Sequence, residues 1–370
     1  MNCNKIIVKT RNKLYPIIIG DKILSSIGTL VKKKMPLVEK ISIIADNKIP
    51  YKTVKELTKS LKKYKIKIYK IDVKEKIKNF SFAQKLVENL LRDNIKRSDC
   101  VIALGGGVVG DLAGFVSSIT KRGVRFINIP TTLLAQVDSS IGGKTGINSN
   151  YGKNLIGTFS QPDLVLTDIS TLKSLPKREI ICGYGEILKH ALVSDKGFFL
   201  WLNKNANKII EDRNKKLLKL AVIKSCKIKS EIVSKDENEK NLRKILNFGH
   251  TFAHGFEGTK KFSKKLNHGE AVLLGMITAC QLAYNKKLLN KNNLDLIKKH
   301  YLNLNFPISI KKIFKKREIN TIINYMQRDK KNFNKKINLI LIKGIGRVIK
   351  PSAINLNGYE IKKFLLKNFI

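Results

Sequence analysis

Short apolar runs that alternate with amphipathic segments constrain the fold of this 370-residue chain more than any other feature. Ile41–Ala45 and Val101–Leu104 consist almost entirely of aliphatic residues, whereas Val54–Leu61 and Ser81–Arg92 place apolar residues at helical spacing. Strands buried on both faces of a parallel sheet read as such continuous apolar runs. Strands that alternate with helices favour a doubly wound sheet. We therefore predict an α/β fold whose N-terminal part is a parallel, Rossmann-like sheet.

The pattern changes near Pro176, after a last predicted strand at Val165–Asp168. Beyond this point apolar residues recur with a helical period, and periodic apolar spacing of this kind predicts amphipathic helices. We expect an α/β domain over residues 1–176 and a mainly α-helical domain over 177–370, with a site in the cleft between them. The predicted helices of the second domain are Arg178–Val193, Phe198–Asn205, Asn214–Ile232, Leu242–Phe256, Glu270–Asn285, Asn293–Tyr301 and the region Lys312–Tyr325.

The excess of lysine is the most unusual property of the composition, and it produces a formal net charge of +45 at pH 7. Such a charge suggests nucleic-acid binding, but the lysines are spread through nearly every amphipathic segment. They also lack the interleaved aromatic residues of a platform for single-stranded nucleic acid. We interpret them as a solvated surface and predict no specific nucleic-acid partner.

Cysteine usage and hydropathy indicate the compartment. The five cysteines have no paired spacing, and their odd number argues against a disulfide framework. The N-terminus has no apolar signal core, and no run approaches the roughly 18 apolar residues that spanning a bilayer requires. We therefore expect a soluble, cytoplasmic protein with no membrane partner.

A glycine cluster follows the predicted strand Val101–Leu104. Gly105, Gly107 and Gly110 satisfy G-x-G-x-x-G between a strand and a helix, where backbone N–H groups can approach a pyrophosphate. In the usual arrangement the next strand ends in an acidic residue that binds a ribose, but here it ends in Pro130-Thr-Thr. A dinucleotide must therefore be held differently, and Asp46, after the first apolar run, is the carboxylate candidate for the adenosine ribose.

A second glycine-rich stretch, Gly142-Gly-Lys-Thr145, resembles the end of a P-loop. The first P-loop glycine is missing, because position 138 is Asp, and no strand directly precedes the motif, so we reject an NTPase. A glycine-rich turn that carries Asp138, Lys144, Lys153 and Asn154 suits an anionic, polyhydroxylated ligand. A solvated basic loop would explain the lysines but not the glycines and the aspartate.

Histidine, the scarcest potential metal ligand here, is concentrated in one region: three of the five histidines lie between positions 250 and 268. His250 and His254 are four apart and would share one face of a helix, and His268 follows in a second motif. Upstream, Glu186 and Lys189 add a carboxylate and an amine three apart. Spacing alone makes His250 and His254 a ligand pair in a metal site built from two or three segments. The two remaining histidines are interpreted as structural: His190 and His300.

Seven motifs, in order from about Asp46 to Asp329, resemble the 3-dehydroquinate synthase family of sugar-phosphate cyclases, which is related in fold to iron-dependent alcohol dehydrogenases and glycerol dehydrogenase. They cover most of the chain, and so many ordered matches are highly specific. The motifs are Gly105–Asp111, Pro130–Leu134, Val137–Thr145, Gly183–Lys189, Leu246–Thr251, His268–Glu270 and Arg328–Lys331.

The resemblance implies an NAD-binding α/β domain followed by a metal- and substrate-binding helical domain. It implies NAD as a catalytic cofactor, a divalent metal (zinc or cobalt) and 3-deoxy-D-arabino-heptulosonate 7-phosphate as the substrate. The implied reaction, the second step of the shikimate pathway, is a carbon–oxygen lyase reaction that yields 3-dehydroquinate and phosphate. It proceeds by transient oxidation, phosphate elimination, re-reduction and intramolecular aldol closure.

The resemblance also implies a role for each matching residue. The metal ligands are Glu186, His250 and His268, so His254 becomes a proton-transfer residue and Glu239 a second acid/base candidate. Three lysines are implied in catalysis: Lys144, Lys189 and Lys229. The implied substrate-binding residues are Arg122, Asp138, Asn154, Arg243, Asn247, Lys330 and Lys331. Arg122 matches an arginine that the family supplies from the partner subunit, which implies a homodimer.

The resemblance implies NAD contacts in the first domain. An acidic Asp46 should repel a 2′-phosphate, which favours NAD over its phosphorylated form. The implied contacts are Asp46, Glu75, Lys78, Gly106, Gly107, Val108, Asp111, Thr131, Thr132, Lys144, Lys153, Thr171, Leu172, Lys173 and Ser174.

Three other functions compete with this interpretation. Other cyclases, such as a 2-deoxy-scyllo-inosose synthase or a sedoheptulose 7-phosphate cyclase, share the metal and cofactor motifs but act on substrates without a carboxylate. Lys229 and Arg243 favour a substrate that bears one. A polyol dehydrogenase would not need a group of Lys, Arg and Asn residues that binds a phosphate and a carboxylate. A nucleic-acid-binding protein would need a localised basic stripe and a recognition motif, and the sequence has neither.

Overall fold

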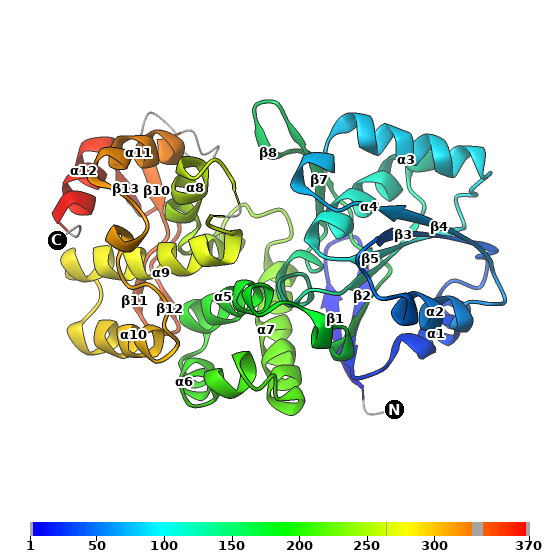
Figure 1. Cartoon of the computed structure of the whole chain (residues 1–370), viewed down its shortest axis with the longest axis horizontal. Coiled ribbons are helices and arrows are strands. Elements are labelled where there is room, and N and C mark those ends of the chain that lie inside the picture. The colour runs from blue at the N-terminus through cyan, green and yellow to red at the C-terminus, as the bar shows by residue number, and fades with distance from the viewer. Residues whose placement is uncertain (1–2, 264, 328–335, 368–370) are drawn as a thin grey trace. The chain divides into compact units, whose positions relative to one another are not determined.

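The computed structural model describes residues 3–263, 265–327 and 336–367. The chain forms two compact units (Figure 1). The first contains Met1–Pro176 and Leu218–Asn238, and the second contains Lys177–Leu217 and Glu239–Ile370. The grouping separates the chain at Pro176, but it also places residues 218–238 with the first unit. The division into domains 1–176 and 177–370 remains a prediction.

The first unit is organised on a seven-stranded sheet of order β1-β2-β9-β6-β5-β3-β4. Every neighbouring pair is parallel except β1 with β2. The strands are β1 (Asn4–Lys9), β2 (Leu14–Gly20), β3 (Lys40–Asp46), β4 (Lys65–Ile71), β5 (Cys100–Gly105), β6 (Arg125–Pro130) and β9 (Leu164–Asp168). The helices are α1 (Ile27–Lys34), α2 (Tyr51–Ser60), α3 (Phe80–Arg92), α4 (Gly107–Ile119) and most of α7 (Lys215–Lys235).

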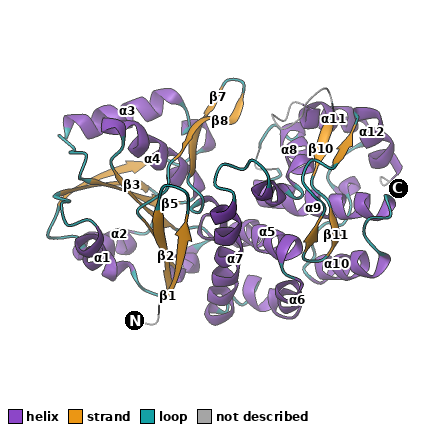
Figure 2. Cartoon of the chain, turned by 180° about the vertical axis from the view of Figure 1, so that it is seen from behind, coloured by secondary structure: helices purple, strands orange, loops and turns teal. Residues whose placement is uncertain are grey.

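Helices cover both faces of this sheet, with α1 and α2 on one face and α3 and α4 on the other (Figures 1 and 2). Successive residues of β3 enter different cores: Ile43 belongs to the core that contains Leu57 of α2, and Ile44 belongs to the core that contains residues of α3 and α4. Successive side chains of a strand point to opposite faces, so a strand covered on both sides must be apolar throughout. The predicted α/β fold with a parallel sheet is confirmed.

The glycine-rich segment after position 142 is not the simple turn that we expected but a two-stranded hairpin of β7 (Lys144–Ser149) and β8 (Gly152–Phe159). Its glycines serve the close approach of the two strands. A Cβ on Gly146 would lie 2.4 Å from the carbonyl oxygen of Ile156, and one on Gly157 would lie 2.2 Å from that of Thr145. Glycine content is a weak signal for a strand because it also marks loops.

The second unit is mainly α-helical, as predicted, and its described residues also form four short strands in two ribbons. Its helices are α5 (Lys177–Ser194), α6 (Lys196–Ile210), α8 (His250–Thr259), α9 (His268–Asn285), α10 (Lys291–Asn303), α11 (Ile319–Gln327) and α12 (Gly358–Lys367). The strands are β10 (Ile337–Leu339), β11 (Ile342–Gly344), β12 (Arg347–Val348) and β13 (Ile354–Leu356). Within the described ranges, no helix has both the length and the apolar character needed to cross a bilayer.

The continuous helix predicted over Leu242–Phe256 is wrong. A short 3₁₀ segment, Leu242–Asn247, ends at Phe248, and α8 begins only at His250. Gly249 between them has φ +79°, and a Cβ there would lie 2.8 Å from the backbone nitrogen of Met276 in α9. Only glycine combines this left-handed conformation with such a close approach of backbone. The break makes His250 the first residue of its helix.

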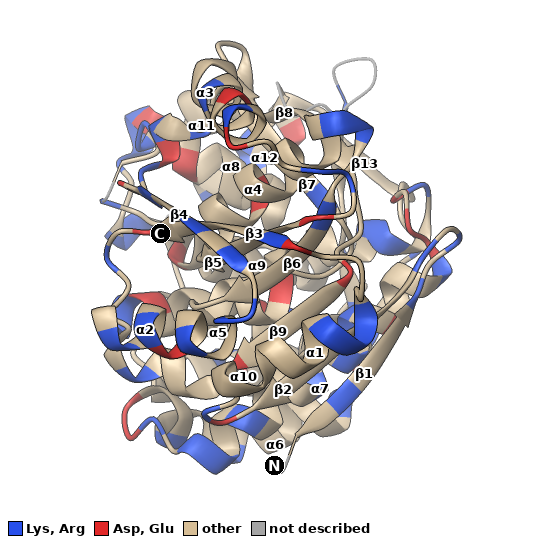
Figure 3. Cartoon of the chain, turned by 90° about the vertical axis from the view of Figure 1, so that its right-hand side faces the viewer, with Lys and Arg blue, Asp and Glu red and all other residues tan. Residues whose placement is uncertain are grey.

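On the side of the first unit that Figure 3 shows, the basic residues lie on several separate elements. These elements include α1, α2 and β1, with acidic residues between some of the basic ones. This distribution agrees with the interpretation of the charge as a solvated surface.

Candidate metal and ligand site

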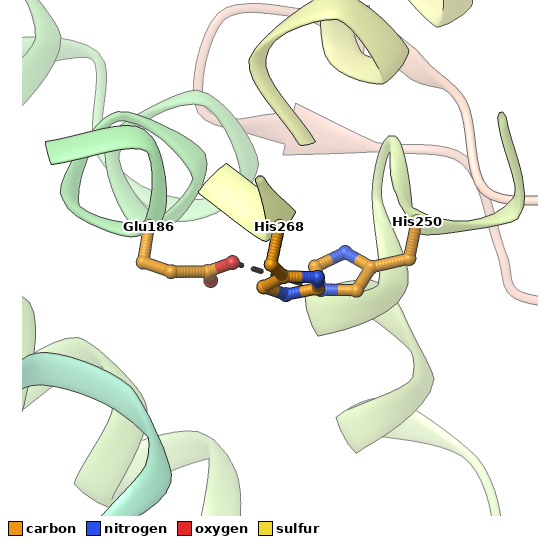
Figure 4. A group of neighbouring side chains, drawn as sticks. All are labelled: Glu186, His250 and His268. Atoms are coloured by element: carbon orange, nitrogen blue, oxygen red, sulfur yellow. Dashed lines mark ion pairs between the residues drawn. The ribbon is translucent and has the colours of Figure 1, made fainter. Parts of the chain in front are cut away.

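Three residues of the second unit bring potential metal ligands together. Glu186 comes from α5, His250 begins α8 and His268 begins α9 (Figure 4). One ligand atom from each of the three lies within 4.8 Å of the others. The Glu186 side chain is 1% exposed, and its Oε1 is 3.6 Å from Nε2 of His250. A buried carboxylate that faces two imidazoles is the donor set of a divalent metal site.

The start of α9 is held against α5 by a close helix crossing. Gly269 donates its N–H to Sγ of Cys182 over 3.2 Å, and a Cβ on Gly269 would lie 2.2 Å from Cα of Cys182. Asn267 caps α9, and Glu270 completes a capping box. The cap and the crossing together place His268 beside Glu186, which lies one turn after Cys182 on α5.

The ring orientation of both histidines follows from their Nδ1 contacts. Nδ1 of His250 lies 3.3 Å from the carbonyl oxygen of Phe248, and Nδ1 of His268 lies 3.1 Å from Oε2 of Glu257. A carbonyl and a carboxylate only accept hydrogen bonds, so Nδ1 carries the proton in both rings. Nε2 then carries the lone pair that a metal requires. The three residues therefore fit a zinc-type ion in both atom type and orientation.

His254 lies near this cluster but is not part of it. Its ring centroid is 5.9 Å from that of His250, and the two rings are nearly perpendicular. In the described part of the chain, the ligand-atom cluster that contains His250 also contains Glu186 and His268, and no cluster contains His254. Lys189, one turn after Glu186, is 2% exposed and forms an ion pair with the Glu186 carboxylate. The contact neutralises a buried negative charge.

Three other predicted residues of the second unit lie on the segment before α8. Glu239 has a left-handed backbone conformation, φ +56°, and its Oε1 accepts a hydrogen bond of 2.6 Å from Nδ2 of Asn247. Arg243, between them in sequence, is 3% exposed. A non-glycine residue in this conformation is uncommon and is enriched at functional sites.

In the first unit, the predicted cofactor residues meet at one edge of the sheet. Asp46 ends β3, the Gly106–Val108 segment follows β5, and Thr131 and Thr132 follow β6. These three strands are adjacent and parallel, so their carboxyl ends lie at the same edge. Gly106 caps the N-terminus of α4, and a Cβ there would lie 3.0 Å from Cγ2 of Thr132. A bare helix N-terminus at a sheet edge suits a pyrophosphate.

A polar cluster joins predicted residues that are far apart in sequence. The ammonium of Lys78, which is 3% exposed, lies 2.7 Å from Oδ2 of Asp111 and also donates to Oδ1 of Asn154. Burial raises the pKa of the Asp111 carboxyl, although Lys78 acts in the opposite direction. Asn148 donates to Oε1 of Glu75 over 2.8 Å and accepts from the backbone of Asn154 over 2.9 Å. No sequence motif pointed to Asn148.

Asp138 and Lys229 form a second charged pair in the same unit. Asp138 lies on a π-helical turn, Ala135–Ser139, and Lys229 lies on α7. The lysine ammonium donates to the backbone oxygen of Asp138 over 2.6 Å and to Oδ1 over 2.7 Å. Gln136 supports the turn from within, because its Nε2 donates to the carbonyl oxygen of Asp168 over 3.0 Å. Single π-turns frequently mark functional sites.

The other predicted site residues differ in exposure. Arg122 is exposed, with φ +61°, and makes no ion pair with any described residue. Thr171 accepts a hydrogen bond from Gln136, and Leu172 is buried. Lys330 and Lys331 lie outside the described residues. The remaining predicted side chains are exposed: Lys144, Lys153, Lys173 and Ser174.

His300 agrees with its structural interpretation, but that of His190 stays a prediction, because a nitrogen of its ring lies within 4.8 Å of a carboxylate oxygen of Glu186. Both histidines are buried in the second unit. His300 contacts Oδ1 of Asn203 through Nδ1 at 3.1 Å and the hydroxyl of Tyr184 through Nε2 at 2.9 Å. Burial lowers the pKa of His300 to about 4, so its ring is neutral at physiological pH. A neutral, fully packed imidazole has the character of a core residue.

Comparisons with known proteins cover nearly the whole chain. Family models described as 3-dehydroquinate synthase N-terminal and C-terminal match residues 68–182 and 183–332. The 3-dehydroquinate synthase of Pelagibacter ubique (strain HTCC1062) is 48% identical over 367 residues, 99% of each chain. The 2-epi-5-epi-valiolone synthase of Streptomyces hygroscopicus subsp. jinggangensis 5008, solved with NAD⁺ and Zn²⁺ bound, shares 25% identity over 98% of each chain, with a TM-score of 0.85.

A second solved structure is similar in fold. A 2-deoxy-scyllo-inosose synthase complexed with carbaglucose-6-phosphate, NAD⁺ and Co²⁺ has a TM-score of 0.83 over 99% of this chain and 100% of that one. Its sequence identity is 24%, so the likeness concerns the fold alone.

Proposed function

The chain belongs to the 3-dehydroquinate synthase family, and from this membership we propose that it converts 3-deoxy-D-arabino-heptulosonate 7-phosphate into 3-dehydroquinate and phosphate. The observation that carries the proposal is the 48% identity to a 3-dehydroquinate synthase over 99% of both chains. The sugar-phosphate cyclases of other specificity match at about half that identity.

Glu186, His250 and His268 would hold a divalent ion of the zinc or cobalt type. The fit rests on their convergence, on the burial of the carboxylate and on the Nδ1 contacts that direct each Nε2. When bound, such an ion polarises vicinal hydroxyl groups of the substrate, which favours loss of a hydride. Two neutral imidazoles and one carboxylate leave it a net positive charge.

The edge of the first unit's sheet would hold NAD. Gly106 and Gly107 expose the N-terminus of α4 to a pyrophosphate, and Asp46, at the end of β3, can accept hydrogen bonds from a ribose. NAD held there would supply reversible hydride transfer with the substrate. Asp111, which forms an ion pair with Lys78, lies just after the first turn of the same helix as Gly107. These NAD contacts are part of the proposal.

The chain's own residues bind, orient and exchange protons with the substrate. We assign the substrate carboxylate and phosphate to two cations, Lys229 and Arg243, and to the amide of Asn247. Once the carbon at position 5 is a ketone, the neighbouring C–H bond becomes acidic, and its electrons can expel the phosphate. The departing phosphate can take that proton, so the protein contributes mainly positioning and proton transfer, through His254 and Glu239.

A direct assay tests this function. Incubating the protein with heptulosonate 7-phosphate, NAD and zinc should release phosphate with no net NADH, because the hydride removed is returned within the same cycle. Phosphate is followed colorimetrically and NADH by its absorbance. Steady accumulation of NADH would instead identify a polyol dehydrogenase. Turnover of sedoheptulose 7-phosphate in place of the heptulosonate would identify another cyclase.

We propose further that the protein acts as a homodimer in which Arg122 serves the partner's site. Arg122 is exposed at the end of α4, next to the exposed apolar residue Ile119. The hydroxyl groups of Ser118 and Thr158 are hydrogen bonded at 3.0 Å and bring β8, with its exposed Phe159, to the same place. Exposed apolar side chains beside a surface cation suit an interface that carries a phosphate contact.

Mixed dimers test the shared site. Arg122→Ala and His250→Ala should each be inactive alone, but co-refolded mixtures should recover activity in one site of each heterodimer. Random pairing then predicts roughly a quarter of wild-type activity. Arg125→Ala, at an exposed arginine that pairs with Asp163 within its own chain, is the matched control and should remain active alone. Inactive mixtures of the two variants would exclude a shared site.

A further inference from the structure

Glu257, which no motif singled out, lies against the proposed metal site. It comes from α8, is 6% exposed, and places Oε2 3.1 Å from Nδ1 of His268. We propose that Glu257 is a positioning residue that selects the tautomer and orientation of His268, so that Nε2 faces Glu186 and His250. The inference rests on the metal assignment in the proposed function.

The two proposed histidine ligands are oriented by different means. His250 has a 13% exposed side chain, and the backbone oxygen of Phe248, two residues away, contacts its Nδ1. The side chain of His268 is 37% exposed, and its Nδ1 contact comes from a carboxylate on a different helix. The more exposed ring therefore relies on a side chain for its orientation. Truncating that side chain should disturb His268 and leave His250 in place.

The carboxylate also decides which ring nitrogen of His268 carries the proton. A carboxylate only accepts hydrogen bonds, so the proton lies on Nδ1 and the lone pair on Nε2. Histidine ligands commonly donate their second N–H to a carboxylate, and this contact raises the basicity of the ligating nitrogen. Glu257 would thus place a negative charge next to Nδ1 of His268, whereas Nδ1 of His250 contacts a neutral carbonyl group.

The packing of α8 on α9 keeps this contact in register. A Cβ on Gly275 of α9 would lie 2.2 Å from the backbone oxygen of Gly249, which precedes α8. Glu257 follows His250 by seven residues, two helical turns, so both lie on the same face of α8. One helix therefore supplies a proposed ligand and the carboxylate that orients another.

The tautomer of His268 tests the proposal without any metal. In the metal-free protein with ¹⁵N-labelled histidine at about pH 8, where imidazole is neutral, long-range ¹H–¹⁵N spectra should show protonated Nδ1. Glu257→Ala should shift His268 to the Nε2–H form, and the dissociation constant for Co²⁺ should rise about 10- to 100-fold. Glu257→Gln, which keeps an acceptor oxygen and nearly the same shape, should restore the Nδ1–H form and recover part of the affinity.

A matched control distinguishes the effect of the Glu257–His268 contact from the effect of removing a negative charge. Glu318 pairs with Lys260 over 2.9 Å, so Glu318→Gln removes a carboxylate of the same unit whose ion pair is with a lysine and not with His268. Its Co²⁺ affinity should stay within about twofold of wild type. If Glu257→Ala keeps both the tautomer and the affinity while His268→Ala loses the metal, Glu257 has no positioning role. If His268→Ala itself keeps full affinity, the metal assignment fails instead.

Discussion

Replacing His250 or His268 by alanine should remove the bound metal and the activity together, whereas His254→Ala should lose activity but keep the metal. The first two residues contribute ligand atoms to the cluster with Glu186, but His254 does not. Loss of metal-assisted charge stabilisation, worth several kcal/mol, corresponds to a fall of about a thousandfold or more in kcat. Removing a proton-transfer residue costs about 10²–10⁴-fold. Activity alone therefore does not distinguish the two roles.

Metal content does. After dialysis against metal-free buffer, elemental analysis should find about one ion per chain in the wild type and in His254→Ala, and almost none in His250→Ala or His268→Ala. With Co²⁺ in place of Zn²⁺, the visible spectrum of His254→Ala should match that of the wild type, because its ligand set is unchanged. Loss of the ion from His254→Ala, with retention in His268→Ala, would overturn the ligand assignment.

Gly249→Ala should strongly destabilise the second unit and weaken metal binding with it. The residue has φ +79°, and its new Cβ would lie 2.6 Å from Cγ and 2.8 Å from the backbone nitrogen of Met276. A left-handed conformation costs a non-glycine residue about 1–2 kcal/mol, and overpacking a core adds about 1–3 kcal/mol. The strain falls directly on the first residue of α8, His250.

Chemical denaturation of the metal-free protein measures this cost. We expect the free energy of unfolding to fall by about 3 kcal/mol or more. Gly197→Ala is the matched control, because Gly197 lies in the first turn of α6 and, among the described residues, its Cβ would meet only Oδ1 of Asp195, at 3.3 Å. That change should be neutral or stabilise by about 0.5–1 kcal/mol. Equal effects at the two positions would show that the approach to Met276 does not constrain residue 249.

Local sequence patterns correctly predicted the parts of the fold that depend on a single physical requirement, such as burial of a strand on both faces. The runs Ile41–Ala45 and Val101–Leu104 are strands because burial on both faces demands continuous apolar side chains. The sheet-edge positions of Asp46 and the 106–108 segment follow from the same rule, since parallel strands end together. The helix predicted across Gly249 was wrong because apolar spacing continues through the break, and only the backbone of Met276 requires the left-handed turn.

For the candidate site, too, the sequence determined some features and the tertiary structure determined others. The sequence by itself determined which ligand types are scarce and where they cluster, and its motifs related Glu186, His250 and His268 to one family. Only the tertiary structure decided which polar atoms meet: Glu257 with His268, and Lys78 with Asp111. Periodicity reports which face of an element is buried, because burial acts on each segment separately. A hydrogen bond between two elements depends on how they pack, and no local pattern carries that information.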